Sequence, residues 1–130
     1  MGILNKIFGT NETTSEDKKV IPWNQLQSLE QLNEIIEESK SIPVAVFKHS
    51  TRCGISRMVI KQFESNYTIE ASQLKLYYLD LLNYRDISNE IGHKLQVMHQ
   101  SPQLIVIKNT ETVAHASHYE INSIDLEQFI

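Results

Sequence analysis

Three apolar segments do most to limit how this chain can fold. They cover residues 43–49, 75–82 and 103–107. The first is apolar almost throughout and lies between turn-forming residues, which is the pattern of a strand buried on both faces of a sheet, and the other two are similar. A sheet with two buried faces needs helices on both sides, so these segments predict a layered α/β domain.

Helical patterns precede or separate these segments. Apolar residues recur at helical spacing over residues 29–36, 58–67 and 87–95. Ser28 begins a capping box in front of the first of these helices, and Asn83 is placed to cap the third. Predicted helices and strands therefore alternate along the chain.

The two ends of the domain add shorter elements. Residues 20–23 predict a short edge strand, residues 108–111 a hairpin turn into a partner strand over 112–116, and Asn122 with Asp125 the start of a last helix. The order β-α-β-α-β-α-β-β-α predicts a central mixed β-sheet with helices on both faces. Right-handed crossovers are expected to place the first helices on one face and the later ones on the other.

Size and charge exclude several classes of protein. The 130 residues are enough for one domain with a core and too few for two. Sixteen acidic residues against twelve basic ones give a net charge of −4, which disfavours a nucleic-acid binder because such a protein needs a basic face. No apolar run approaches the ~20 residues that span a bilayer.

The first 19 residues differ in composition from the rest. Residues 1–9 are weakly amphipathic, and residues 10–19 have no large apolar side chain. We therefore expect a flexible leader and linker over residues 1–19 and a folded domain over residues 20–130. The leader lacks the pattern of a secretory signal, so a cytoplasmic location is expected.

The single cysteine of the chain, Cys53, is its most informative polar residue. One thiol per chain excludes an intramolecular disulfide and a metal site built from several thiolates of one chain. Cys53 lies at the start of the helix whose apolar stripe covers residues 58–67, where free N–H groups and the helix dipole favour a thiolate. Arg52, Arg57 and His49 can add positive charge there. Such settings lower the pKa of a cysteine from ~8.5 to between ~3.5 and ~7.5.

A simpler interpretation makes Cys53 a small buried apolar residue. Its neighbours Arg52, Gly54 and Ser56 are unusual for a core. The core-facing stripe of this helix begins only at Met58. We therefore expect Cys53 to be exposed and reactive.

The stretch Cys53-Gly54-Ile55-Ser56 has a hydroxyl where a dithiol motif has its second cysteine. Serine cannot form a disulfide, so a second thiol must come from a small molecule or from another protein. The expected intermediate is then a mixed disulfide on Cys53. Ser56 either donates a hydrogen bond to the thiolate or only caps the helix.

Ser101-Pro102 directly precedes the third apolar segment. A proline at this position removes a ladder donor and is typical of a tight turn, in which the X–Pro bond is cis or trans. Taken alone, a trans bond is favoured, because only ~5% of X–Pro bonds in folded proteins are cis.

A cysteine that opens the helix after the first long buried strand, together with a proline just before an antiparallel strand, resembles the thioredoxin fold. The resemblance covers residues 20–130. It implies that Pro102 follows a cis bond and flanks the thiol, and that the backbone of Ser101 binds extended disulfide substrates.

Three stretches, residues 49–56, 83–88 and 99–103, are similar to those of the monothiol bacilliredoxins. These are small cytosolic redox proteins of bacteria that use bacillithiol, and oxidative stress is their setting. The resemblance implies that Cys53 attacks the disulfide between bacillithiol and a client protein, frees the client and becomes bacillithiolated. It also implies bacillithiol as co-substrate, S-bacillithiolated proteins as partners, no bound cofactor and a monomeric state.

Bacillithiol carries two carboxylates on its malate group, so the resemblance also implies a cationic contact. Arg52, Lys48 and Arg57 are candidates because they are close to Cys53 in sequence, although each is more simply interpreted as a solvated surface charge. The residues expected to support the thiolate or the substrate are Arg52, Gly54, Ser56, Ser101 and Pro102.

Two alternative functions stay open. The motif at Cys53 differs by one residue from the Cys-Gly-Phe-Ser of monothiol glutaredoxins, which hold a [2Fe–2S] cluster between two subunits. That family has a glycine pair late in the chain, whereas this chain has no glycine after Gly92. The second alternative is a non-catalytic adaptor with a thioredoxin fold, for which Cys53 is dispensable.

Overall fold

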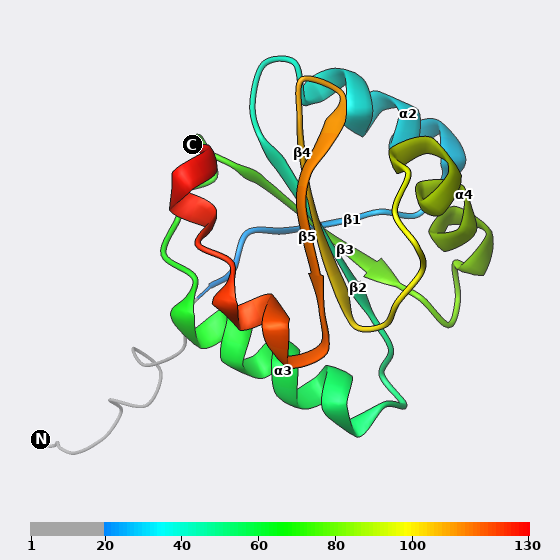
Figure 1. Cartoon of the computed structure of the whole chain (residues 1–130), viewed down its shortest axis with the longest axis vertical. Helices are drawn as coiled ribbons and strands as arrows, with labels where there is room; N and C mark the ends of the chain where they lie inside the picture. The colour runs from blue at the N-terminus through cyan, green and yellow to red at the C-terminus, as the bar shows by residue number, and fades with distance from the viewer. Residues whose placement is uncertain (1–19) are drawn as a thin grey trace, which may run out of the picture.

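The structure is a computed structural model that describes residues 20–130, so the leader and linker predicted over residues 1–19 lie outside the described residues. Within the described range, strands and helices follow the predicted order as far as the last helix (Figure 1). In chain order the elements are β1 (Trp23–Gln25), α2 (Leu29–Glu38), β2 (Val44–His49), α3 (Gly54–Asn66), β3 (Lys75–Asp80), α4 (Arg85–Leu95), β4 (Gln103–Lys108), β5 (Glu111–Ser117) and the 3₁₀ helices η1 (His118–Ser123) and η2 (Leu126–Phe129).

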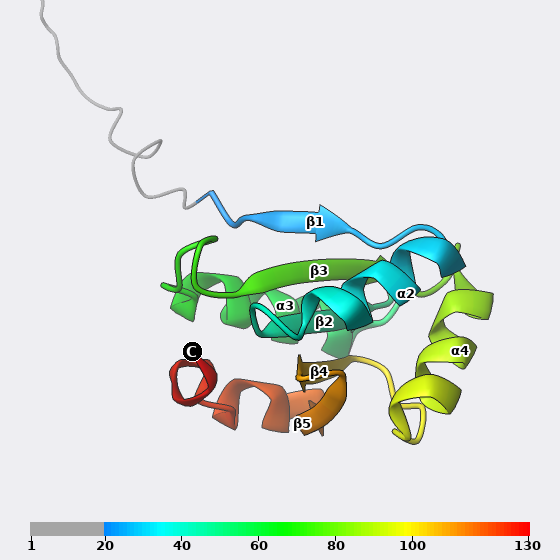
Figure 2. The same ribbon diagram turned by 90° about the horizontal axis from the view of Figure 1, so that it is seen from above.

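The strands form one mixed sheet with the order β1-β3-β2-β4-β5, which runs from top to bottom in Figure 2. Strands β1, β3 and β2 are parallel, whereas β4 is antiparallel to β2, and β5 is antiparallel to β4. Strand β2 is paired on both sides and all of its residues are buried, as its apolar pattern predicts. The predicted mixed α/β sheet is therefore confirmed.

Helices cover both faces of the sheet, but not in the predicted grouping. Helices α2 and α4 lie on one face, and α3 lies on the other face together with η1 and η2 (Figure 1). The chain passes from β1 across β3 to β2 and then turns back to β3. Right-handed connections that run in opposite directions place their helices on opposite faces. The predicted grouping was wrong because it depends on the strand order, which the sequence pattern does not contain.

Alternate residues of the central strands build two separate cores. In β2, Val46 packs with α2 and α4, and Phe47 packs with α3, η1 and η2. The same alternation directs Lys48 toward Ser88 of α4 and the next residue, His49, toward α3. The end of β2 thus delivers two consecutive polar side chains to opposite faces of the sheet.

Three local predictions were wrong in detail. The edge strand expected over residues 20–23 lies instead at Trp23–Gln25. Asn83 does not cap α4, because its side chain donates to Asp80 Oδ2 (2.7 Å) and Tyr84 takes the cap position without a side-chain bond. The predicted last helix is instead the pair of short 3₁₀ helices. Each buries one apolar residue, Ile121 in η1 and Leu126 in η2, which is too little to stabilise a longer α-helix.

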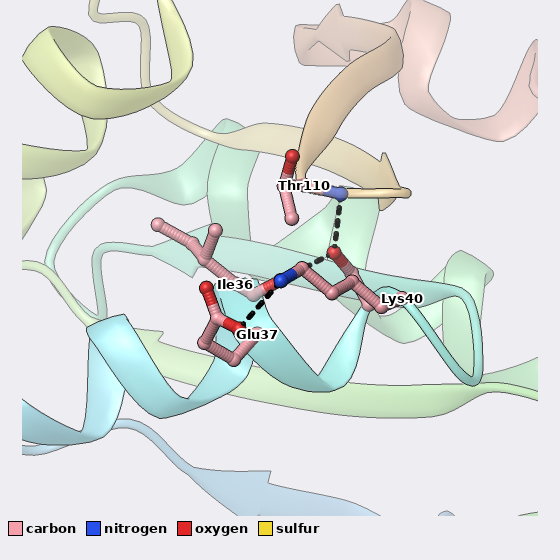
Figure 3. Close-up of polar contacts among 5 residues, drawn as sticks. Ile36, Glu37, Lys40 and Thr110 are labelled. Atoms are coloured by element: carbon pink, nitrogen blue, oxygen red, sulfur yellow. Dashed lines mark hydrogen bonds and ion pairs between the residues drawn. The ribbon is translucent and has the colours of Figure 1, made fainter.

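Ser39 joins the end of α2 to the β4–β5 turn. Its Oγ donates to the carbonyl of Ile36 (2.6 Å) and accepts the N–H of Thr110 (2.8 Å), and its own carbonyl accepts the N–H of Asn109 (2.8 Å). Asn109 and Thr110 have φ values of 54° and 68°, as the two central residues of a tight hairpin turn require. Figure 3 shows the Thr110 amide directed at the end of α2.

Replacing Ser39 with alanine should therefore loosen the contact between α2 and the hairpin. Ser39→Ala leaves the Thr110 amide without its partner, so the free energy of unfolding should fall by about 1–2 kcal/mol. Urea unfolding measures this, with the exposed neighbour Ser41→Ala as a control that should change stability by less than about 0.5 kcal/mol. Equal effects of the two substitutions would contradict a specific role of Ser39.

Candidate active site around Cys53

Cys53 occupies the N-cap position of α3 and is half-buried. Its N–H donates to the carbonyl of Ser50 (3.2 Å), and its own carbonyl accepts the N–H of Arg57 (3.0 Å), which is the first hydrogen bond of the helix. The structure therefore places the thiol at the N-terminus of α3 rather than among the core residues.

Ser56 lies one turn into α3 and is fully buried. Its Oγ accepts the N–H of Ser50 (3.1 Å) and lies 2.7 Å from Nδ1 of His49. The hydroxyl therefore ties the start of α3 to the end of β2. Two roles were predicted for Ser56, donation to the thiolate or capping of the helix, and within the described residues its hydroxyl does neither, since its bonds go to the end of β2 and the loop before α3.

His49 is almost fully buried beside Tyr78, with ring centroids 5.6 Å apart. Burial is the main cause that lowers its pKa, and the charge of Arg57 lowers it further, whereas Asp80 and Glu64 act in the opposite direction. The ring is therefore mostly neutral at neutral pH. It supplies less positive charge near the thiol than the sequence led us to expect.

The other predicted residues near the thiol are exposed. Arg52 makes no hydrogen bond or ion pair within residues 20–130, and Arg57 Nη1 donates to the carbonyl of Thr51 (3.0 Å). Gly54 has an ordinary φ, and a Cβ added to it would lie 3.9 Å from the Arg57 guanidinium. Glycine is therefore not required at position 54.

The loop before β4 and the loop that carries Cys53 lie at the same edge of the sheet. Lys48 of β2 pairs with Gln103 of β4, so the residues that follow Lys48 and those that precede Gln103 lie at one end of the sheet, the lower end in Figure 1. The Ser101–Pro102 bond is cis. The cis bond that the resemblance implied is confirmed, and the trans bond favoured by proline statistics alone is wrong.

The backbone groups of Ser101 are unpaired among the described residues. Within residues 20–130 its N–H and carbonyl make no hydrogen bond, and its Oγ is buried without a partner. The carbonyl of buried Pro102, by contrast, accepts the N–H of His118 (3.0 Å) and continues the sheet. The free backbone groups of Ser101 can pair with an extended segment, which is the role that the resemblance implied.

Lys48 is not the surface charge that the sequence suggested. It is fully buried on the α4 side of β2, where its Nζ donates to Ser88 Oγ (3.2 Å) and lies 2.9 Å from Nδ1 of His99. Burial lowers its pKa to about 8. Ser88 and His99 fall in the stretches that resemble the bacilliredoxins, but neither was predicted to contact Lys48. The alternation of side chains along β2 is the signal that could have placed Lys48 in the interior.

Residues 20–130 contain no group of three His, Cys, Asp or Glu side chains arranged to hold a metal ion. In the same range, no helix has both the length and the apolar character needed to cross a bilayer.

The bonds of Ser56 predict a stability difference between two positions of the same motif. Ser56→Ala removes the partner of the Ser50 amide and of His49 Nδ1, so the free energy of unfolding should fall by about 1–3 kcal/mol. Gly54→Ala adds a helix-favouring methyl group in ordinary van der Waals contact with the Arg57 guanidinium and should raise it by about 0.5 kcal/mol. Urea unfolding of both variants checks this, and a Ser56→Ala protein as stable as Gly54→Ala would show that these bonds are not structural.

The lowered pKa of Lys48 predicts a rise in stability with pH. Between pH 8 and 10.5 the unfolded chain holds a proton on Lys48 that the folded protein has lost, so the free energy of unfolding increases with pH. Between pH 7 and pH 10, the free energy of unfolding of wild type should rise by about 2 kcal/mol more than that of Lys48→Met. Tyrosine titration affects both proteins and cancels in this comparison. If the stability of wild type and of Lys48→Met changed equally with pH, the lowered pKa of a buried Lys48 would be refuted.

Comparisons with known proteins agree with this geometry. A solved structure described as a candidate oxidoreductase with a thioredoxin fold has 36% sequence identity and a TM-score of 0.70, over 82% of this chain and 92% of that one. The thioredoxin Mala s 13 of Malassezia sympodialis has 18% identity and a TM-score of 0.64 (82% and 89% covered), and Schistosoma mansoni thioredoxin has 22% and 0.60 (85% and 100%). These two likenesses show the fold.

The family itself follows from the sequence of the domain. Residues 24–126 match the family described as Monothiol bacilliredoxin BrxC. The matched range begins within β1 and includes β2 to β5, the thiol at the start of α3 and the cis peptide bond before β4. This chain therefore belongs to the monothiol bacilliredoxin family and has a thioredoxin fold.

Proposed function

We propose that this protein is a thiol–disulfide oxidoreductase that removes bacillithiol from S-bacillithiolated proteins through a mixed disulfide on Cys53. The observation that carries the proposal is a single half-buried thiol at the start of α3, with a hydroxyl already engaged by Ser50 and His49 where a resolving thiol would lie. Without a second cysteine in the 130 residues, the chain cannot close an internal disulfide.

The first step exchanges one disulfide for another. The Cys53 thiolate attacks the bacillithiol sulfur of the mixed disulfide on the client. The bond between the client and bacillithiol breaks, and a bond between Cys53 and bacillithiol forms. The client sulfur leaves as a thiolate and takes a proton from water, so no external oxidant or reductant is needed in this step.

The second step regenerates the thiol. The thiolate of a free low-molecular-weight thiol, bacillithiol itself in the proposal, attacks the bacillithiol sulfur on Cys53. Cys53 leaves as a thiolate, and the disulfide passes to two small molecules. A dithiol reductase would achieve the same exchange. Bacillithiol is thus a co-substrate and not a resident cofactor.

Substrate binding is assigned to the two loops at the end of the sheet. The unpaired N–H and carbonyl of Ser101 would bind an extended client segment, with Pro102 holding the loop beside the thiol. Exposed Arg52 would contribute positive charge at the entrance, and Gly54 and Ser56 would shape the first turn of α3. The monomeric state and the cytoplasmic location expected from the sequence belong to the same proposal.

The proposal predicts the transfer of one bacillithiol group to Cys53. Intact-mass measurement after mixing with a bacillithiolated model protein should show one adduct on wild type and none on Cys53→Ser, because the variant has no other thiol. Urea-denatured protein should form the adduct more slowly, since the helix start and the Ser101 loop are then lost. The same model protein carrying glutathione in place of bacillithiol tests whether the exchange rate depends on the identity of the small thiol.

Three outcomes would contradict this function. Equal rates for folded and denatured protein would remove the case for a built site. Client release that does not depend on Cys53 would favour an adaptor. A brown dimer after anaerobic purification would favour the cluster carrier.

A further inference from the structure

One buried cation of the fold has no counter-ion. Lys48 is fully buried, yet none of the ion pairs within residues 20–130 includes it. Its bonds go to Ser88 and His99, neither of which carries a negative charge. An ammonium group away from water destabilises a fold unless it is compensated, and an apolar residue of similar size is often as stable or more so. A lysine at this buried position therefore calls for a role beyond packing.

Two further basic side chains surround Ser88, the hydroxyl that Lys48 contacts: His99 Nδ1 lies 3.4 Å from Ser88 Oγ, and Arg85 precedes Ser88 by one turn of α4. Arg85, the first residue of α4, is exposed and makes no hydrogen bond or ion pair within the described residues. The positive charges of Lys48 and Arg85 both lower the pKa of His99, after the larger effect of burial. We refer to Lys48, Arg85 and His99 as the basic cluster. None of the ion pairs within residues 20–130 neutralises Lys48 or Arg85, so a bound anion would reduce the mutual repulsion of the two charges.

Lys48 also decides which nitrogen of His99 carries the proton. An ammonium group only donates hydrogen bonds, so Nδ1 of His99 must accept the bond from Lys48 Nζ (2.9 Å). The neutral ring then carries its proton on Nε2, which Lys48 does not use. Because His99 is exposed, this N–H is available to a ligand at the surface.

The basic cluster borders the loop that receives the substrate in the proposed function. His99 lies two residues before Ser101, and Lys48 pairs with Gln103, the residue after Pro102. Figure 1 shows this loop running from α4 to the end of the sheet at which α3 begins. A ligand on the basic cluster would therefore lie on the α4 side of the loop, whereas Cys53 belongs to α3 on the other face.

We propose that the basic cluster is a carboxylate subsite for the disulfide substrate, in which Arg85 and His99 Nε2–H contact the carboxylate and Lys48 positions His99 from beneath. The inference rests on the proposed function, to which it adds the residues that bind a carboxylate of the substrate beside its disulfide. A carboxylate there supplies the counter-charge that the fold lacks. Lys48 is thus a positioning residue, not a contact residue.

Paired small disulfides test this subsite. We would measure the exchange rate of Cys53 with 5,5′-dithiobis(2-nitrobenzoate), which carries carboxylates, and with neutral 2,2′-dithiodipyridine. The quantity compared is the ratio of the rate with the carboxylate-bearing disulfide to the rate with the neutral one. Arg85→Gln, Lys48→Met and His99→Asn should each lower the ratio about threefold, the size expected for one partly screened charge or one lost donor. His99→Asn keeps an acceptor for Lys48 and removes only the outward N–H.

A matched control comes from the other end of α4. Lys94→Gln removes the same charge from the last turn of the helix, where Lys94 pairs with Glu90, and should leave the ratio unchanged. Raising the salt concentration from 0.05 M to 0.5 M should lower the ratio of wild type and have less effect on Arg85→Gln, because the attraction is screened. An equal ratio in wild type and all three cluster variants would overturn the subsite.

The design separates this inference from the function on which it rests. If the neutral disulfide reacted no faster with folded protein than with denatured protein, the proposed function would fail, whatever the ratios. If it reacted faster and the ratios did not move, only the subsite would fail. A further pair of substrates shows which half of the substrate carries the carboxylate: mixed disulfides of uncharged 2-mercaptoethanol with an acidic peptide and with a neutral peptide. Faster exchange with the acidic peptide would place the carboxylate on the client, and equal rates would place it on the small thiol.

Discussion

The pairing of β2 with its two neighbours is the constraint on which the rest of the structure depends. Parallel β3 on one side and antiparallel β4 on the other bury every residue of β2. The carboxyl end of β2 and the amino end of β4 consequently meet at one edge of the sheet. That edge brings the Cys53 loop and the Ser101–Pro102 loop together, although nearly fifty residues separate them along the chain.

Each of these two loops is supported from a different face of the sheet by consecutive residues of β2. His49 reaches Ser56 below the Cys53 loop, and Lys48 reaches His99 in the loop before β4. Both supports are buried polar contacts, which are expensive to leave unsatisfied and therefore hold their loops in one arrangement. The charges differ, since the ring of His49 is mostly neutral while Lys48 is mostly protonated at neutral pH. The thiol side is thus less positive, and the α4 side more positive, than their sequence positions suggest.

Local patterns predicted the elements of the fold well, and predicted their arrangement less well. The buried strands, the hairpin turn and the amphipathic helices follow from side-chain periodicity and turn chemistry, which act over a few residues. The grouping of α2 with α4 does not, because it depends on β3 lying between β1 and β2. Asn83 failed as a cap for a similar reason, since Asp80 competes for its side chain once β3 ends there.

For the site, the sequence by itself determined the chemistry: one thiol at a helix start, a hydroxyl in place of a second thiol, and a proline before a strand, at Cys53, Ser56 and Pro102. Those features depend on residue identity and on neighbours along the chain. Only the tertiary structure decided what surrounds them, including the burial of Lys48 and its bond to His99. Strand pairing and the packing of α4 join residues that are about fifty positions apart, and no local pattern records such contacts.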